Sequence, residues 1–248
     1  MSTPETSLPT AVVTGGGTGI GRACSIALAR RGHPVAVVYG HSAADAASTV
    51  EEITAAGGRA AALQADVTDD AAVRAMAARA HAELGPVGVL VNNAGATVPL
   101  PLDDLDGATD EIFQQLFSVN VLSAWYCARA LAGDLRAADD GVVINIGSIA
   151  ALSGNGSSLP YVVSKAALSG LTRALARALA PVRVDEVAPG LVLTRWWAGR
   201  EERGRELAAN SVLGRETTPD DVAAAVVGLV SSRTITGQTL VVDGGQTL

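Results

Sequence analysis

The sequence has 248 residues, of which 48% are hydrophobic and 3% aromatic, and its formal net charge is −7. The apolar fraction predicts a sizeable core built from Ala, Val, Leu and Ile. The acidic balance and the scattered basic residues argue against a nucleic-acid partner. Two cysteines, Cys24 and Cys127, are too few for a secreted disulfide scaffold, and we expect both to be buried free thiols.

The amino-terminal residues 1–10 lack the charged and apolar regions of a signal peptide. No uncharged apolar run reaches the length needed to cross a bilayer. The sequence therefore predicts a cytoplasmic protein without a membrane partner. No metal site is expected.

Short Val-rich runs alternate with longer Ala- and Leu-rich runs at helical spacing along the chain. Strands are expected at 11–14, 34–39, 60–65, 87–92, 141–146, 182–187 and 238–242. Helices are expected at 19–31, 43–56, 70–84, 110–137, 161–180 and 219–229. Continuous apolar strands indicate burial on both faces, which is typical of a parallel sheet covered by helices.

This alternation predicts an α/β protein with a Rossmann fold, a doubly wound parallel sheet of about seven strands with helices on both faces. No linker and no internal repeat divides the sequence, so residues 1–248 are expected to form one catalytic domain.

A glycine-rich loop, 14–21, follows the first expected strand and opens the first expected helix. A helix N-terminus offers unpaired N–H groups and the positive end of the helix dipole, which suit a pyrophosphate. An ordinary β–α turn is the alternative, but the position between strand and helix favours a dinucleotide site. The residues expected to bind the cofactor here are Gly15, Gly17, Thr18, Gly19, Ile20 and Gly21.

The loop after the second strand bears on the choice between NADP and NAD. An NAD-binding fold usually places a carboxylate there, on the ribose 2′-hydroxyl. Here Tyr39, His41 and Ser42 occupy the loop, so NADP is preferred, with NAD as the alternative. Asp66 and Val67 follow the third strand, where the aspartate is expected either to accept from the adenine amino group or to cap the next helix.

Three residues carry the expected chemistry. Ser148 follows the fifth strand, Tyr161 comes 13 residues later, and Lys165 lies one helical turn beyond it. A phenol with a pKa of about 10 is a poor base at neutral pH, and a neighbouring ammonium lowers that pKa. Tyr161 and Lys165 are thus a plausible acid/base pair. Taken alone, this spacing is also typical of a surface pair on a helix.

At this point the sequence resembles the short-chain dehydrogenase/reductase family, and is similar to its 3-oxoacyl-ACP-reductase-like members. The resemblance extends from Val12 to Gly245. Its motifs, in family order, are 14–21, 92–95, Asn120, Ser148, Tyr161 with Lys165, Pro189-Gly190 with Thr194, and 236–238 with 243–245.

The resemblance implies a role for each motif residue. Tyr161 would exchange a proton with the substrate oxygen, and Ser148 would hydrogen-bond that oxygen. Lys165 would lower the tyrosine pKa and hold the nicotinamide ribose, while Asn120 would anchor a water linking Lys165 to solvent. The residues implied to flank the cofactor are Asn93, Ala94, Gly95, Tyr161, Lys165, Pro189, Gly190, Val192 and Thr194.

Residues 191–210 are expected to form a lid over the substrate. Trp196 and Trp197 lie in it and favour an apolar or ring-shaped carbonyl or alcohol, although packing on neighbouring helices explains them equally well. The sequence departs from the family pattern at Asp185, where relatives often carry Asn, and at Thr18, where NADP-using relatives often carry a basic residue. The connections at 181–182 and 231–234 also look short.

Two alternatives remain open from the sequence. One is a catalytically silent nucleotide-binding regulator on the same fold, against which the intact catalytic residues argue. The other is a reductase of 3-oxoacyl groups held on an acyl carrier protein. Such carriers are acidic and dock on arginines, so the net charge of −7 favours a free small-molecule ketone. The family resemblance also implies a homotetramer or homodimer.

Overall fold

The computed structural model describes residues 8–194, 202 and 211–248. In this part of the chain, seven strands form one sheet in the order β3-β2-β1-β4-β5-β6-β7, and every neighbouring pair is parallel. The strands are β1 Thr10–Thr14, β2 Val35–Tyr39, β3 Ala60–Gln64, β4 Val87–Asn92, β5 Val142–Ile146, β6 Arg183–Pro189 and β7 Thr239–Val242. The predicted doubly wound parallel sheet is confirmed.

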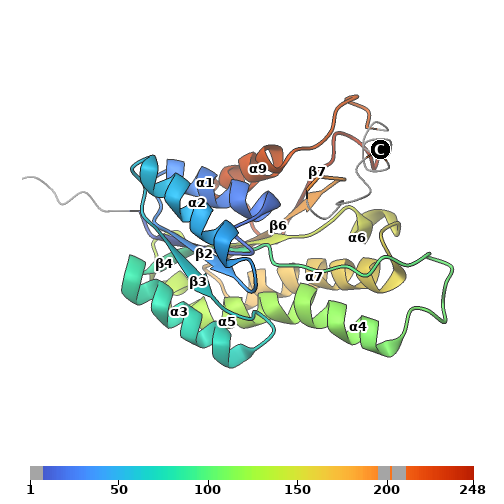
Figure 1. Ribbon diagram of the computed structural model, residues 1–248, viewed down its shortest axis with the longest axis horizontal. Coiled ribbons are helices and arrows are strands. Elements are labelled where there is room, and N and C mark those ends of the chain that lie inside the picture. The colour runs from blue at the N-terminus through green and yellow to red at the C-terminus, as the bar shows by residue number, and fades with distance from the viewer. Residues whose placement is uncertain (1–7, 195–201, 203–210) are drawn as a thin grey trace, which may run out of the picture.

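Helices cover both faces of this sheet, as Figure 1 shows: α1, α2 and α9 lie on one side, and α3, α5 and α7 on the other. The described helices are α1 Gly19–Arg30, α2 Ala43–Ala55, α3 Asp70–Leu84, α4 Asp110–Phe117, a π-helix at Ser118–Leu122, α5 Ser123–Ala137, α6 Ala150–Ser153, α7 Leu159–Ala178 and α9 Pro219–Ser231.

Two hydrophobic cores result, one on each face of the sheet. Cys24 lies in the core under α1 and α9, and Cys127 in the core under α3, α5 and α7. Both thiols are free and fully buried, as expected. Burial disfavours the thiolate, and it raises the pKa of each cysteine to about 12.

The expected long helix at 110–137 is interrupted. One π-helical turn at Ser118–Leu122 separates α4 from α5, and Asn120 lies within it. Such turns widen the helix locally and often accompany functional sites. The short helix α6, only four residues long, was not predicted, and α7 begins two residues earlier than expected because Ser158 accepts a hydrogen bond from the Tyr161 N–H.

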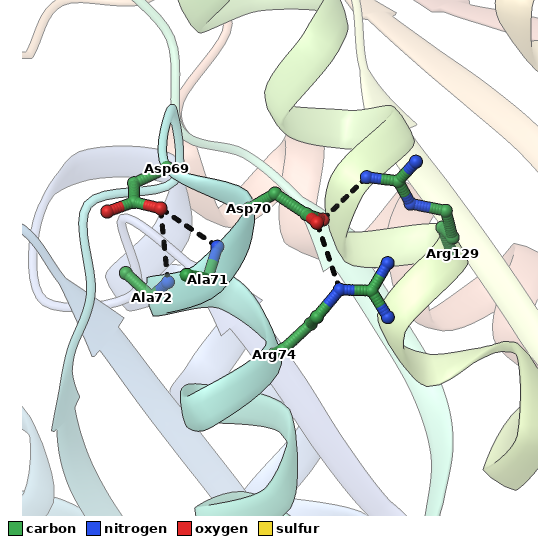
Figure 2. A network of polar contacts seen from close by, with 6 residues as sticks. All are labelled: Asp69, Asp70, Ala71, Ala72, Arg74 and Arg129. Atoms are coloured by element: carbon green, nitrogen blue, oxygen red, sulfur yellow. Dashed lines mark hydrogen bonds and ion pairs between the residues drawn. The ribbon is translucent and has the colours of Figure 1, made fainter.

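The start of α3 fixes the loop at the carboxyl end of β3. Asp69 is the N-cap, and its side chain accepts hydrogen bonds from Ala71 N–H at 2.8 Å and Ala72 N–H at 3.4 Å (Figure 2). Asp66 does not cap the helix, so that alternative is wrong. Its carboxylate instead accepts from the backbone N–H and the hydroxyl of Thr68.

An ionic network ties α3 to α5. Asp70 accepts from Arg74 at 2.9 Å and from Arg129 at 2.6 Å (Figure 2). These hydrogen bonds, from Arg74 first and then Arg129, lower the pKa of the Asp70 carboxyl. The Arg129 guanidinium also lies 5.3 Å from the ring centroids of both Trp125 and Tyr126, on its own helix.

Within the described residues, no helix combines the length and the apolar character needed to span a bilayer.

Candidate active site

The glycine loop connects β1 to α1 and leaves the helix N-terminus open. Thr18 is the N-cap residue, yet its side chain makes no capping hydrogen bond, and the first turn of α1 carries no acidic residue. Gly21 is required in this turn, because a Cβ there would lie only 2.8 Å from the Gly15 carbonyl carbon. The loop therefore combines close backbone approach with uncapped helical N–H groups, which fits the pyrophosphate of a dinucleotide.

Two hydroxyl groups outside the sequence motifs hold this loop from behind. Ser25 donates to the Gly16 carbonyl at 3.0 Å, and Thr49 lies 3.3 Å from the Gly17 carbonyl. Nothing in the sequence pattern marks these side chains, because each partner is a backbone atom in a different element.

The loop after β4 is fixed to the end of β1. The backbone N–H groups of Asn93 and Ala94 both donate to the Thr14 hydroxyl at 3.0 Å, and the Asn93 side chain donates to the Thr14 carbonyl at 2.9 Å. Gly95 follows at the same edge of the sheet. The expected cofactor residues 93–95 thus lie against the glycine loop.

The segment after β6 also lies beside the glycine loop. Pro189 ends the strand, Gly190 donates to the Val242 carbonyl at 2.9 Å, and Val192 forms an isolated parallel bridge with Thr217. A Cβ on Gly19 would lie 3.2 Å from Cγ2 of Thr194, so this segment touches the glycine loop. Most of the expected lid, 195–201 and 203–210, with Trp196 and Trp197, lies outside the described residues.

Ser148, Tyr161 and Lys165, here called the candidate triad, come together at the carboxyl end of β5. The side chains of Ser148 and Tyr161 share a hydrogen bond. The Lys165 ammonium donates to the Ile146 carbonyl at 2.9 Å and lies 5.9 Å from the centroid of the Tyr161 ring. Lys165 is only 5% exposed, and it is the only lysine in the 248-residue sequence.

Burial dominates the titration of the candidate triad. It raises the pKa of the Tyr161 phenol, and the hydrogen bond with Ser148 opposes that change in part. It lowers the pKa of Lys165 to about 8, which the negative charge of Glu186 opposes. The expected lowering of the tyrosine pKa by Lys165 is therefore not the net effect here: the phenol pKa moves upward because desolvation disfavours the phenolate.

Asn120 contacts the loop after β4 rather than the lysine itself. Its carbonyl oxygen accepts from Ala96 N–H at 2.8 Å, and its amide donates to the Ala96 carbonyl at 3.0 Å and to the Ser164 hydroxyl at 2.9 Å. A Cβ on Gly95 would lie 3.3 Å from the Asn120 carbonyl oxygen and 3.7 Å from the Lys165 nitrogen. Asn120 and Lys165 thus border the same glycine.

The residues expected at the adenosine end lie at the carboxyl ends of β2 and β3. Tyr39 is half-buried, whereas His41, Ser42 and Asp66 are exposed. Hydrogen bonds from Thr68 are the main cause that lowers the pKa of Asp66, and His41 contributes a smaller charge effect in the same direction. Val67 is half-buried and packs against the core below.

Known proteins are similar to this chain in sequence and in fold. A family model described as "Enoyl-(Acyl carrier protein) reductase" matches residues 15–247. A 3-oxoacyl-acyl-carrier-protein reductase of Staphylococcus aureus is 34% identical, over 95% of this chain and 96% of that protein.

Solved structures of similar proteins have the same fold. A short-chain dehydrogenase of Burkholderia cenocepacia in complex with NADP superposes with a TM-score of 0.89 at 36% identity, covering 97% of this chain and 98% of that one. A 7α-hydroxysteroid dehydrogenase with NADH and 7-oxo glycochenodeoxycholic acid gives 0.88 at 33% identity, covering 96% and 93%.

A Rossmann sheet with a glycine loop and a Ser–Tyr–Lys set at its carboxyl edge defines a class of nicotinamide-dependent oxidoreductases. The chain belongs to the short-chain dehydrogenase/reductase family. It is an NAD(P)-dependent oxidoreductase, as the sequence resemblance implies.

Proposed function

We propose that this enzyme interconverts a ketone and a secondary alcohol with Tyr161 as its acid/base. The observation that carries the proposal is the hydrogen bond between Ser148 and Tyr161 beside the buried amine of Lys165. A bound nicotinamide supplies the hydride chemistry. The substrate is a small-molecule carbonyl or alcohol.

In the reductive direction, the Tyr161 hydroxyl donates its proton to the substrate oxygen. A phenol with a pKa of about 10 holds its proton at neutral pH, and burial favours this protonated form further. The Ser148 hydroxyl donates a hydrogen bond to the same oxygen and holds it in place. The Lys165 ammonium stabilises the negative charge that forms on Tyr161 after the proton has left.

Tyr161→Phe removes the exchangeable proton while it keeps the ring, and it tests this role. We expect kcat for ketone reduction to fall by about 10²- to 10⁴-fold with NADPH binding retained. Tyr126→Phe is the matched control, because Tyr126 lies on α5 against Arg129 and is expected to change nothing. Full activity of Tyr161→Phe would refute the assignment.

A silent nucleotide-binding regulator makes the opposite prediction for the wild-type protein. It would bind NADPH tightly and oxidise it with no ketone of a broad panel. NADPH consumption followed optically with linear, cyclic and aromatic ketones separates the two.

We also propose a preference for NADP over NAD. Exposed His41 and Ser42 follow β2, where no carboxylate stands to repel a 2′-phosphate. His41→Asp is expected to weaken NADPH binding and to spare NADH binding, as measured by the two dissociation constants. A wild-type protein that binds NADH more tightly would contradict this proposal.

Two substrate classes have support. The solved 7α-hydroxysteroid dehydrogenase is complexed with 7-oxo glycochenodeoxycholic acid, a free small molecule, which favours a free ketone as substrate. The 3-oxoacyl-acyl-carrier-protein reductase relative favours a carrier-bound acyl group. The two classes are distinguished by comparing kcat/KM for an acetoacetyl group on acyl carrier protein with kcat/KM for the same group on a short thioester. A carrier-dependent enzyme should prefer the substrate on acyl carrier protein by a large factor.

For assembly and location, we propose a cytoplasmic homotetramer or homodimer formed through α4 and α7, with neither nucleic acid nor membrane as a partner. Phe117 on α4 and Val163 on α7 are 39% and 42% exposed, which supports burial in a subunit interface. Sedimentation analysis of wild type and Val163→Lys tests it, and a wild-type monomer at micromolar concentration would contradict it.

A further inference from the structure

A fully buried carboxylate, Glu186, lies next to the candidate triad. It occupies the middle of β6, paired with Asn145 on β5 and Thr239 on β7, and it is 0% exposed. Its Oε1 accepts from the Ser169 hydroxyl at 2.9 Å, and its Oε2 from the Thr239 hydroxyl at 3.4 Å. A buried carboxylate held by neutral hydroxyls is costly unless a positive charge is near.

The carboxylate is in contact with the backbone that leads to Ser148. A Cβ on Gly147 would lie 2.7 Å from Cδ and 2.9 Å from Cγ of Glu186, closer than any real packing allows. The missing side chain at position 147 thus leaves the space that the carboxylate fills. Gly147 directly precedes Ser148 and follows Ile146, whose carbonyl binds the lysine.

The positive charge is that of Lys165. Ser169 lies one helical turn after Lys165 on α7, so the helix turns both toward Glu186. Burial lowers the pKa of Lys165 to about 8, and the Glu186 carboxylate is the opposing influence. Burial raises the pKa of Glu186, and the hydrogen bond from Ser169 and then the positive charge of Lys165 oppose that change.

We propose that Glu186 is a positioning residue whose carboxylate keeps Lys165 protonated at neutral pH, and thereby keeps an ammonium beside Tyr161. This inference rests on the proposed function, because it matters only where the charge on Lys165 assists Tyr161.

Among the described residues, the charged groups that act on Glu186 come from one element. Lys165 and the exposed Arg173 both lie on α7, whereas the uncharged Gly147 follows β5 and the uncharged Thr239 lies on β7. Asp185 precedes Glu186 on the same strand and is also fully buried, but alternation turns it to the opposite face. Asp185 is therefore a matched control for removing one buried carboxyl from β6.

A single lysine allows a direct measurement. In protein labelled with ¹³C-lysine, the Cε resonance reports the protonation of Lys165 without turnover, and we expect a midpoint of about 8 in the wild type. Glu186→Gln should move that midpoint down by about one pH unit. Asp185→Asn should leave it in place.

Kinetics supply a second readout. The basic limb of the kcat/KM profile for ketone reduction should move to lower pH in Glu186→Gln by a similar amount, and not in Asp185→Asn. If Glu186→Gln does not fold, Ser169→Ala keeps the carboxyl but removes the donor to Oε1. That change favours the neutral carboxyl and should lower the Lys165 midpoint in the same direction, by less.

A Lys165 midpoint that is the same in wild type, Glu186→Gln and Ser169→Ala would overturn the inference, as would an equal shift in Asp185→Asn. Failure of the proposed function gives a different result: Tyr161→Phe would stay active, while Glu186→Gln would still lower the Lys165 midpoint.

Discussion

Replacing Gly147 with alanine tests the tight packing between β5 and the Glu186 side chain. The backbone of Gly147 does not need a positive φ, so alanine is allowed there, and the three atoms nearest to the added Cβ all belong to Glu186. The carboxylate must move, and it then loses its 2.9 Å hydrogen bond from Ser169. Overpacking costs about 1–3 kcal/mol and a hydrogen bond to a charged group about 1.5–3 kcal/mol, so Gly147→Ala should lower the free energy of unfolding by about 3 kcal/mol.

A double-mutant cycle separates this cause from a general effect of alanine. The Glu186→Ala background removes the three atoms nearest to the added methyl, so the cost of Gly147→Ala should shrink to within about 0.5 kcal/mol of zero. Urea unfolding followed by circular dichroism measures all four proteins. An equal cost in both backgrounds would refute the claim that the carboxylate fills the space beside Gly147.

Three further predictions concern other parts of the chain. Burial raises the pKa of Asp185, whose Oδ2 has no hydrogen-bond partner. The ionised carboxylate therefore destabilises the folded state. This loss of stability is absent below the unfolded-state pKa and grows as the pH rises through the folded-state pKa. Asp185→Asn should therefore raise the free energy of unfolding by about 1–2 kcal/mol at pH 8 and by little near pH 4, in urea unfolding across pH. Gly21→Ala should weaken NADPH binding by about tenfold or more in calorimetry, because its Cβ would meet the Gly15 carbonyl, and undiminished affinity would contradict the loop geometry. Arg129→Ala should lower the urea midpoint through loss of the bond to Asp70, and the difference should shrink at ~1 M salt; a salt-independent change would point to lost packing instead.

The sequence predicts the sheet well, because strands buried on both faces are near-continuous runs of Val, Ile and Ala that stand apart from the helical segments. All seven strands overlap their expected ranges. It misses α6, whose four residues are too short to show a period, and the π-turn around Asn120, because one extra residue in a helical turn hardly changes the apolar spacing.

The candidate active site was likewise predicted in part. The motif residues converge because the carboxyl ends of parallel strands share one edge, which topology alone dictates. Ser25 and Thr49 could not be predicted, because each binds a backbone carbonyl of the glycine loop from a different element. Glu186 escapes for a further reason: a sequence shows a carboxylate in an apolar strand, but not which face it takes or which charge it meets.

Burial disfavours the charged form of both Tyr161 and Lys165, and one neighbouring side chain opposes each effect. Desolvation disfavours the Tyr161 phenolate, and Ser148 opposes that change through a hydrogen bond. Desolvation equally disfavours the Lys165 ammonium, and Glu186 opposes that change through its charge. Both effects matter to the proposed chemistry, because Tyr161 becomes a phenolate when it gives up its proton, and Lys165 stabilises that negative charge only as an ammonium. In this proposal Glu186 favours the charged form of Lys165, just as Ser148 favours the charged form of Tyr161, and Glu186 does so without contacting substrate or cofactor.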